Sequence, residues 1–319
     1  MVKWIKIFTA FVVFIYCNNA SWFRAVPSNE ISFLAHRGVH QTYSKIGLSD
    51  HDCTADRIYK PENEFLENTI ESIEQAFSFG AEIVEIDIKI TKDKQFAVFH
   101  DATIDCRTNG KGQTRKQTLA YLQSLDIGYG YTYDGGKTFP LRGKGVGKMP
   151  SLAEVLDKFP QQKFLINIKD GNDSVAGFIN EFLNNRSNED LSRLSFYGRG
   201  SPAEELLKLN PNLTGFNKRT AKKCAIEYAS IGWSGYVPQS CRNTFMIIPK
   251  EYANYLWGWP RLLVHRMNKV NTQVILVDRS DGHMDGLDDP EYIKALSKDY
   301  RGMVWTDKIE KVGKVQQVQ

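Results

Sequence analysis

Polar side chains that suit phosphate chemistry stand at the ends of apolar segments in the first third of the chain. A histidine–arginine–glycine triplet follows the apolar run at 31–35, two carboxylates lie two positions apart in the next run, and a second histidine follows the run at 96–99. Histidines exchange protons near neutral pH, arginine binds phosphate through paired hydrogen bonds, and neighbouring carboxylates bind hard divalent cations. The pattern predicts a metal-assisted site for a phosphate group, formed by His36, Arg37, Glu85, Asp87 and His100.

The spacing of Glu85 and Asp87 places both carboxylates on one face of a strand, because side chains alternate between its two faces. The apolar residues at 84, 86, 88 and 90 fall on the other face, where helices would cover them. If the carboxylates face the inside of a barrel they need a cation, because buried like charges repel each other, and Mg²⁺ or Ca²⁺ would suit them. The alternative is that this face of the strand lies in water.

The elements that would position these residues alternate between strands and helices. Strands are expected at 31–35, 82–90, 96–99, 163–168, 194–197, 213–216, 244–248, 273–277 and 303–306. Helices are expected at 68–79, 152–159, 175–183, 202–209, 221–230, 251–256 and 290–298. This alternation predicts an α/β fold, a (β/α)8 TIM barrel with its active site at the carboxyl ends of the strands. Two doubly wound domains are the alternative, which the lack of a glycine-rich dinucleotide motif disfavours.

The first twenty residues differ in character from the rest. Lys3 and Lys6 precede an apolar run at 7–16, and small or polar residues lead to Ala20, which predicts a signal peptide at 1–20 and an exported catalytic domain at 21–319, periplasmic or secreted. The alternative is an uncleaved N-terminus that contacts a membrane. The net charge of +4 is too small to indicate a nucleic-acid partner, and nothing indicates an oligomeric state.

Four cysteines follow the predicted signal peptide, and an even number in an exported chain suggests disulfides. Of the three pairings available to them, we favour Cys53–Cys106 and Cys224–Cys241, the second of which closes a short loop. The alternative is four free buried thiols.

Two long segments interrupt the alternation, at 39–65 and at 127–148, and the second is rich in Gly, Tyr and Lys. Long loops in compact domains are often functional, so these two would wall a pocket if both lay on the catalytic face. The alternative is a pair of solvated insertions without a role.

Taken in order, the motifs resemble the signature of glycerophosphodiester phosphodiesterases. The likeness extends from Phe33 to Asp307 and rests on His36-Arg37-Gly38, Glu67-Asn68-Thr69, Glu85-Ile86-Asp87, Thr91-Lys92-Asp93, His100-Asp101, Ser151–Leu156, Asn167-Ile168-Lys169 and Val304–Asp307. It implies a (β/α)8 barrel that uses one divalent cation to hydrolyse a small glycerophosphodiester to sn-glycerol 3-phosphate and an alcohol.

The resemblance also implies roles for single positions. His36 and His100 match the acid–base histidines, Arg37 and Lys169 match phosphate contacts, and Trp305 matches a residue of the pocket wall. The metal ligands would be Glu85, Asp87, Glu67 and Asn167.

Asn167 departs from the family pattern, which commonly has a glutamate at this position. An amide oxygen can coordinate a cation but carries no charge, so we expect weaker cation affinity or a preference for a metal that the substrate phosphate also holds. The alternative is that Asn167 only supports its neighbours and that water completes the metal site.

Two other functions compete with this interpretation. A phospholipase could act on phospholipids or lysophospholipids with the same residues, using aromatic side chains of the C-terminal third such as Trp233, Tyr236, Trp257 and Trp259, although these are better explained as outer-layer packing. A non-catalytic phosphodiester-binding protein is suggested by the loss of one metal carboxylate.

Overall fold

Eight parallel strands form a nearly closed barrel in the computed structural model, which describes residues 2–21, 30–49, 52–172, 174–198, 200–296 and 298–315. Neighbouring strands follow the order β6-β5-β4-β2-β1-β10-β8-β7. Their bounds are β1 Ser32–His36, β2 Ile83–Ile90, β4 Lys163–Ile168, β5 Leu194–Gly198, β6 Thr214–Asn217, β7 Phe245–Pro249, β8 Gln273–Ser280 and β10 Met303–Thr306. The predicted (β/α)8 barrel is confirmed.

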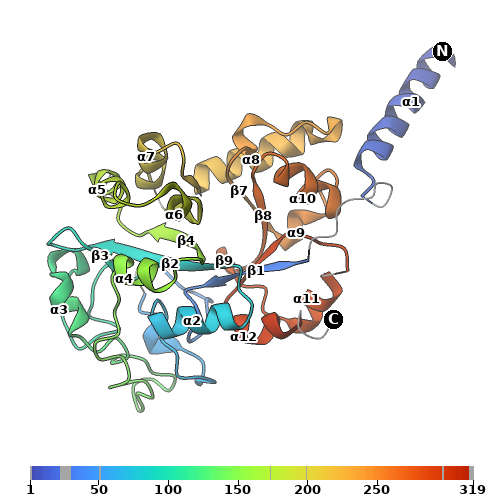
Figure 1. Cartoon of the computed structure of the whole chain (residues 1–319). Helices are drawn as coiled ribbons and strands as arrows, with labels where there is room; N and C mark the ends of the chain where they lie inside the picture. Colours follow the sequence, from blue (N-terminus) through green and yellow to red (C-terminus); the bar gives the residue numbers. More distant parts are fainter. Residues whose placement is uncertain are drawn as a thin grey trace.

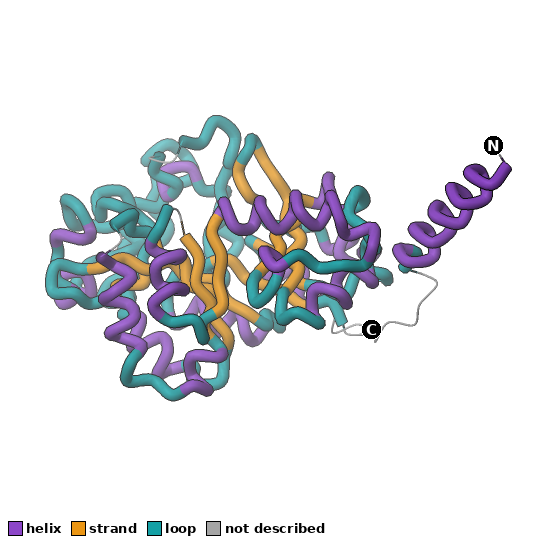
Figure 2. The backbone as a smooth tube through the Cα atoms, turned by 90° about the horizontal axis from the view of Figure 1, so that it is seen from above, coloured by secondary structure: helices purple, strands orange, loops and turns teal. Residues whose placement is uncertain are grey.

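The helices surround the strands, as Figures 1 and 2 show. They are α2 Ile70–Ser78, α3 Leu119–Gln123, α4 Leu152–Lys158, α5 Ser174–Leu183, α6 Asn188–Ser192, α7 Pro202–Leu209, α8 Lys218–Ile231, α9 Lys250–Ala253, α10 Arg261–Asn268, α11 Pro290–Leu296 and α12 Ile309–Val312. The outward strand residues pack against these helices in a large apolar layer, whereas a smaller apolar cluster fills the inside of the barrel. Helix α4 begins with a capping box of Ser151 and Glu154.

The seam of the barrel lies between β6 and β7, the two ends of the strand order. Side chains bridge it: the Thr244 hydroxyl donates to the Gly215 carbonyl at 2.9 Å, and the Thr214 hydroxyl donates to Asn243 Oδ1 at 3.1 Å. The seam lies far along the sheet from β1 and β2, which carry the predicted site.

The strand before His100 is not a barrel strand. This corrects the expectation that all five residues of the predicted phosphate site lie at the ends of barrel strands. β3, Phe96–Val98, pairs antiparallel with the extended end of β2, with Ile88 opposite Val98. The chain therefore turns back towards the barrel mouth, and the Phe99 amide donates to the Asp87 carbonyl at 2.9 Å. This hairpin delivers His100 beside Asp87.

The segment between β3 and α4 builds a second apolar cluster beside the barrel. It packs with the loop at 39–65 through side chains from both segments, including Ala55, Ile58, Leu125 and Tyr131. The two long segments are therefore packed together rather than solvated, and they stand next to the strand ends that carry the predicted site.

Both predicted disulfides form. Cys53–Cys106 joins the 39–65 loop to the segment after β3, with the two Cα atoms 5.7 Å apart. Cys224–Cys241 ties α8 to the turn before β7, with its Cα atoms 4.8 Å apart. Cys17 is a free thiol.

The N-terminal helix α1, Val2–Asn19, stands away from the barrel in Figures 1 and 2, and none of its side chains is buried. Its inner end is attached: Asn18 and Asn19 donate to the Trp233 carbonyl at 3.0 and 2.8 Å. Within the described residues, no helix combines the length and apolar character needed to cross a bilayer. The predicted signal peptide covers this helix, while Met1 and residues 22–29 lie outside the described residues.

Candidate active site

Glu85 and Asp87 lie inside the barrel and are fully buried. On the same strand Val84, Ile86 and Ile88 pack under the helices, as the alternation predicts. The alternative of a strand face in water is therefore wrong. Parallel pairing brings further predicted residues alongside, because His36 of β1 lies opposite Glu85 and Asn167 of β4 lies opposite Asp87.

Arg37 and Gly38 form a turn with left-handed backbone, at φ of 57° and 77°. A Cβ at Gly38 would lie 2.7 Å from the carbonyl carbon and oxygen of Ser72, so only glycine fits this position. The Arg37 amide donates to the Glu85 carbonyl at 2.9 Å, and the Arg37 carbonyl accepts from the Asn68 amide at 3.0 Å. These bonds hold the buried Arg37 guanidinium over the ends of β1 and β2.

His36 is oriented by a carboxylate from the other end of the chain. Its Nδ1 lies 2.5 Å from Asp307 Oδ1, which leaves Nε2 facing Glu85 Oε2 at 3.8 Å. Burial and the Arg37 cation lower the pKa of His36 to about 4, although Asp307 acts in the opposite direction. The imidazole is thus neutral at pH 7 and available as a base. Trp305 packs against it, with ring centroids 5.1 Å apart.

His100 has a matching arrangement at the end of the β3 hairpin. Its Nδ1 lies 2.6 Å from Asp101 Oδ1, and Arg107 Nε donates to Asp101 Oδ2 at 2.8 Å. Burial and Arg37 lower the pKa of His100, but a quarter of its side chain remains exposed. Both predicted histidines therefore present Nε2 as the nitrogen not held by a carboxylate.

Asp87 is surrounded by donors. Arg37 Nε lies 2.9 Å from its Oδ2, at an angle that gives an ion pair rather than a hydrogen bond, and Lys169 Nζ lies 3.7 Å from its Oδ1. The amides of Asn68 and Asn167 donate to the same carboxylate at 3.1 and 2.9 Å. Burial acts to raise the pKa of Asp87, but the Arg37 and Lys169 cations outweigh it and hold that pKa well below its usual value.

Only one of the two carboxylate oxygens of Glu85 accepts a hydrogen bond from the described residues. Tyr197 donates to its Oε1 at 2.6 Å, whereas Oε2 is buried and has no hydrogen-bond donor among the described residues. Burial and the neighbouring Asp87 charge raise the pKa of Glu85 to about 8. An orphaned carboxylate oxygen beside a second carboxylate fits a divalent cation, so Glu85 and Asp87 are the residues that would hold one.

Glu67 is positioned differently from a metal ligand. Its Oε1 accepts from Arg37 Nη1 and its Oε2 accepts from Arg107 Nη1, both at 3.0 Å. Both oxygens thus face guanidinium groups. Asn167 likewise turns its amide nitrogen, a donor, towards Asp87. The predicted four-ligand set is brought close together, but Glu85 alone presents a free carboxylate oxygen within it.

One other group in the described residues could hold a metal, namely His36, His40 and Asp307. Its carboxylate already has a cation, because Lys45 Nζ donates to Asp307 Oδ2 at 2.8 Å and to Asp285. Glu85 is therefore the more suitable position for a cation.

Several functional residues escaped the sequence argument: Asn68, Arg107, Tyr197, Lys45 and Asp307. Asn68 and Asp307 stand within motifs that carry the family resemblance, and so does Asp101. Nothing in the sequence, however, shows that the Asp307 carboxylate faces His36 or that the Asp101 carboxylate faces His100. Arg107 and Lys45 lie in irregular segments, where no periodic pattern indicates the direction of a side chain.

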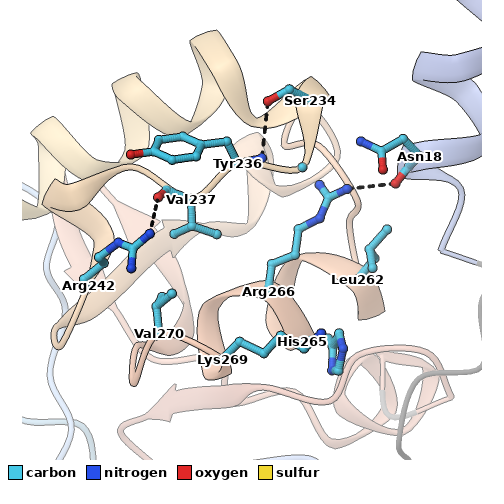
Figure 3. A pocket seen from close by; sticks show the side chains of 11 residues that line it. Asn18, Ser234, Tyr236, Val237, Arg242, Leu262, His265, Arg266, Lys269 and Val270 are labelled. Atoms are coloured by element: carbon cyan, nitrogen blue, oxygen red, sulfur yellow. Dashed lines mark hydrogen bonds between the residues drawn. The ribbon is translucent and has the colours of Figure 1, made fainter.

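A hollow of about 470 Å³ lies away from this site, beside the inner end of α1 (Figure 3). Arg266 crosses it and donates to the Asn18 carbonyl at 2.8 Å. None of the predicted site residues lines it, so it is separate from the chemistry at the barrel mouth.

A TIM barrel whose mouth gathers two histidines, an arginine, a lysine and buried carboxylates has the fold and the residue types expected of a phosphodiesterase barrel. Residues 36–194 match the model of the Glycerophosphoryl diester phosphodiesterase family. The chain belongs to this family, and the recognised motifs of its first half are the ones that build the mouth described above.

The chain is 34% identical over 105 residues to a glycerophosphodiester phosphodiesterase of Caldanaerobacter subterraneus, covering 32% of this chain and 39% of that protein. It is 29% identical over 133 residues to a mouse lysophospholipase D, covering 40% of each. It thus spans less than half the length of these relatives. A phosphodiesterase of Oleispira antarctica, solved with its product sn-glycerol-3-phosphate, shares the fold at a TM-score of 0.56 and 18% identity, covering 92% of this chain and 97% of that one.

Proposed function

We propose that this chain hydrolyses glycerophosphodiesters to sn-glycerol 3-phosphate and an alcohol. The observation that carries the proposal is the pair of histidines, each held at Nδ1 by a carboxylate, close to the Arg37 guanidinium and the buried Asp87. The family match and the enzyme names of the relatives support the same reaction class.

In the proposed mechanism one histidine accepts a proton from the glycerol hydroxyl next to the phosphate. That oxygen bonds to phosphorus, the bond from phosphorus to the alcohol oxygen breaks, and the other histidine gives the alcohol its proton. Water then opens the cyclic phosphate with the histidine roles reversed. Arg37 and Lys169 neutralise the phosphate oxygens in both steps.

A divalent cation, Mg²⁺ or Ca²⁺, would supply further positive charge to the phosphate when held by Glu85 and Asp87. The orphaned Glu85 oxygen supports this part of the proposal. Asn167 and Glu67 would stabilise the site around it rather than add a free carboxylate oxygen.

We also propose that the protein is exported. Two disulfides are expected in an oxidising compartment and are rare in the cytosol, and the charged–apolar–small order of residues 1–20 is that of a signal peptide. Mass spectrometry of the N-terminus of protein recovered from the producing cells would test this, and a cytosolic chain with free thiols would contradict it.

The decisive experiment is an assay of the purified chain on glycerophosphocholine, with Mg²⁺, Ca²⁺ or Mn²⁺ and with EDTA as control. We expect turnover that EDTA suppresses, and a loss of about 10²- to 10⁴-fold on replacing either histidine with alanine. His265→Ala, on α10 and away from the mouth, is the matched histidine control and should retain activity. Near-normal turnover of His100→Ala would refute the mechanism, and no turnover on any diester would favour a binding protein.

Lysophospholipid hydrolysis is the second candidate, because the mouse relative is named a lysophospholipase D. The aromatic residues that could bind an acyl chain do not reach the mouth: Trp257 and Trp259 pack against the outer apolar layer, and Trp233 contacts Phe11 of α1. We therefore expect faster turnover of glycerophosphocholine than of lysophosphatidylcholine.

A further inference from the structure

Arg107 lies outside every strand and helix, yet its guanidinium is the most connected cation of the site. It is 2% exposed. Its Nε donates to Asp101 at 2.8 Å, its Nη1 to Glu67 at 3.0 Å and to the Tyr131 hydroxyl at 2.5 Å, and its Nη2 to the Thr54 hydroxyl. A buried arginine with this many partners is held in one orientation.

The two carboxylates that Arg107 binds each hold a residue of the proposed chemistry with their other oxygen. Asp101 uses Oδ2 for Arg107 and Oδ1 for His100 Nδ1. Glu67 uses Oε2 for Arg107 and Oε1 for Arg37. Arg107 thus connects a histidine and the phosphate-binding arginine through one rigid group.

The disulfide Cys53–Cys106 stands directly beside this group in the chain. Thr54 follows Cys53, and Arg107 follows Cys106, so the disulfide fixes the two backbones next to the Thr54–Arg107 hydrogen bond. Thr54 and Arg107 are 53 residues apart in the chain, and neither lies within a strand or an α-helix. Without the covalent link, the guanidinium would depend on loop packing for its position.

We propose that Arg107 is a positioning residue, fixed by the Cys53–Cys106 disulfide, that orients the His100 imidazole through Asp101. The inference rests on the proposed function, because it assigns an orientation to a histidine of that reaction. A displacement of a reacting group by about 1 Å can cost about 10²-fold in rate, so the link should matter for turnover more than for substrate binding.

The test compares two disulfide variants of the full chain. Cys53→Ala/Cys106→Ala removes the link at the site, and Cys224→Ala/Cys241→Ala removes the remote one between α8 and the turn before β7. With glycerophosphocholine, we expect kcat to fall about 10- to 100-fold in the first variant with KM changed much less, and to stay within about twofold of wild type in the second. Urea unfolding of both variants, followed by circular dichroism, shows whether each is folded in the assay. An equal fall in kcat in both variants, or none in the first, would overturn the proposal.

Arg107→Lys keeps both the disulfide and the positive charge, so it tests the same idea if the first variant does not fold. Lysine cannot reproduce the planar fork, so kcat should fall as in the disulfide variant. Unchanged kcat in Arg107→Lys would refute the positioning role.

A readout that does not need activity separates this inference from the proposed function. Imidazole ¹⁵N spectra, assigned with His100→Gln, should show His100 protonated at Nδ1 in a stable hydrogen bond in wild type, and a weakened bond in Arg107→Lys and in Cys53→Ala/Cys106→Ala. If wild type lacks turnover but the spectra change as expected, the function fails and the positioning stands. If the His100 signal does not change, the positioning fails whatever the activity.

Discussion

Without metal, the Glu85 side chain holds a proton near neutral pH, and a divalent cation would have to displace this proton in order to bind. Replacing Glu85 by glutamine removes that titrating group. Burial and Asp87 raise the pKa of Glu85 from 4.5 to about 8, so without metal the folded protein keeps a proton that the unfolded chain has already lost. The contribution of Glu85 to the stability of the metal-free protein therefore falls as pH rises from about 4.5 to about 8.

The clearest window for this effect lies between pH 6.5 and 8. Below pH 6.5 the buried histidines change stability in the opposite direction. The pKa of His36 is lowered to about 4, so as the pH falls the unfolded chain binds a proton before the folded protein does, and the folded protein loses stability. Above 6.5 the Glu85 effect amounts to about 1.4 kcal/mol per pH unit, or about 2 kcal/mol across the window. Glu85→Gln has no proton to lose and should lack this loss.

Urea unfolding of EDTA-treated protein at pH 6.5 and pH 8 measures the difference. We expect wild type to lose about 2 kcal/mol between the two pH values relative to Glu85→Gln, and added Mg²⁺ or Ca²⁺ to restore wild type more at pH 8 than at pH 6.5. Glu310→Gln is the matched control, because Glu310 also has an orphaned buried oxygen and a raised pKa but lies on α12. It should keep the full cation response. Equal pH dependence in wild type and Glu85→Gln would refute the reasoning, and so would an equal cation response.

The other predictions concern the surroundings of this site and the remote disulfide. Asn167→Asp adds a third carboxylate, so cation affinity measured by calorimetry should rise at least about tenfold while the metal-free protein becomes less stable; unchanged affinity would show that Asn167 lies outside the metal's reach. Lys45→Met removes the cation on Asp307, so the pKa of His36 should rise and the acidic limb of kcat/KM should move to higher pH; an unmoved limb would contradict the His36–Asp307 coupling. Removing Cys224–Cys241 should cost about 3 kcal/mol in urea unfolding, because the link closes a loop of 17 residues, and a loss below about 1 kcal/mol would contradict this.

Some parts of the site could be read from local patterns. The alternation around Glu85 and Asp87 predicted their inward face, because every neighbour on the opposite face is apolar and the strand period is two. His100 was expected at the mouth and is found there, but the antiparallel direction of β3 was missed, since a three-residue strand shows no direction in its sequence.

The sequence by itself determined the order of strands and helices, the faces of the strands and the types of residue at their ends, because these depend on spacing along a few residues. Tertiary structure alone decided which charges meet. His36 and Asp307 are 271 positions apart and touch because β1 pairs with β10, the last strand of the chain, in the middle of the sheet. Arg107 reaches Asp101 and Glu67 from an irregular segment that a disulfide ties in place. Such contacts depend on how distant segments pack, and this packing also leaves one Glu85 oxygen without a donor among the described residues, at the place where a cation would bind.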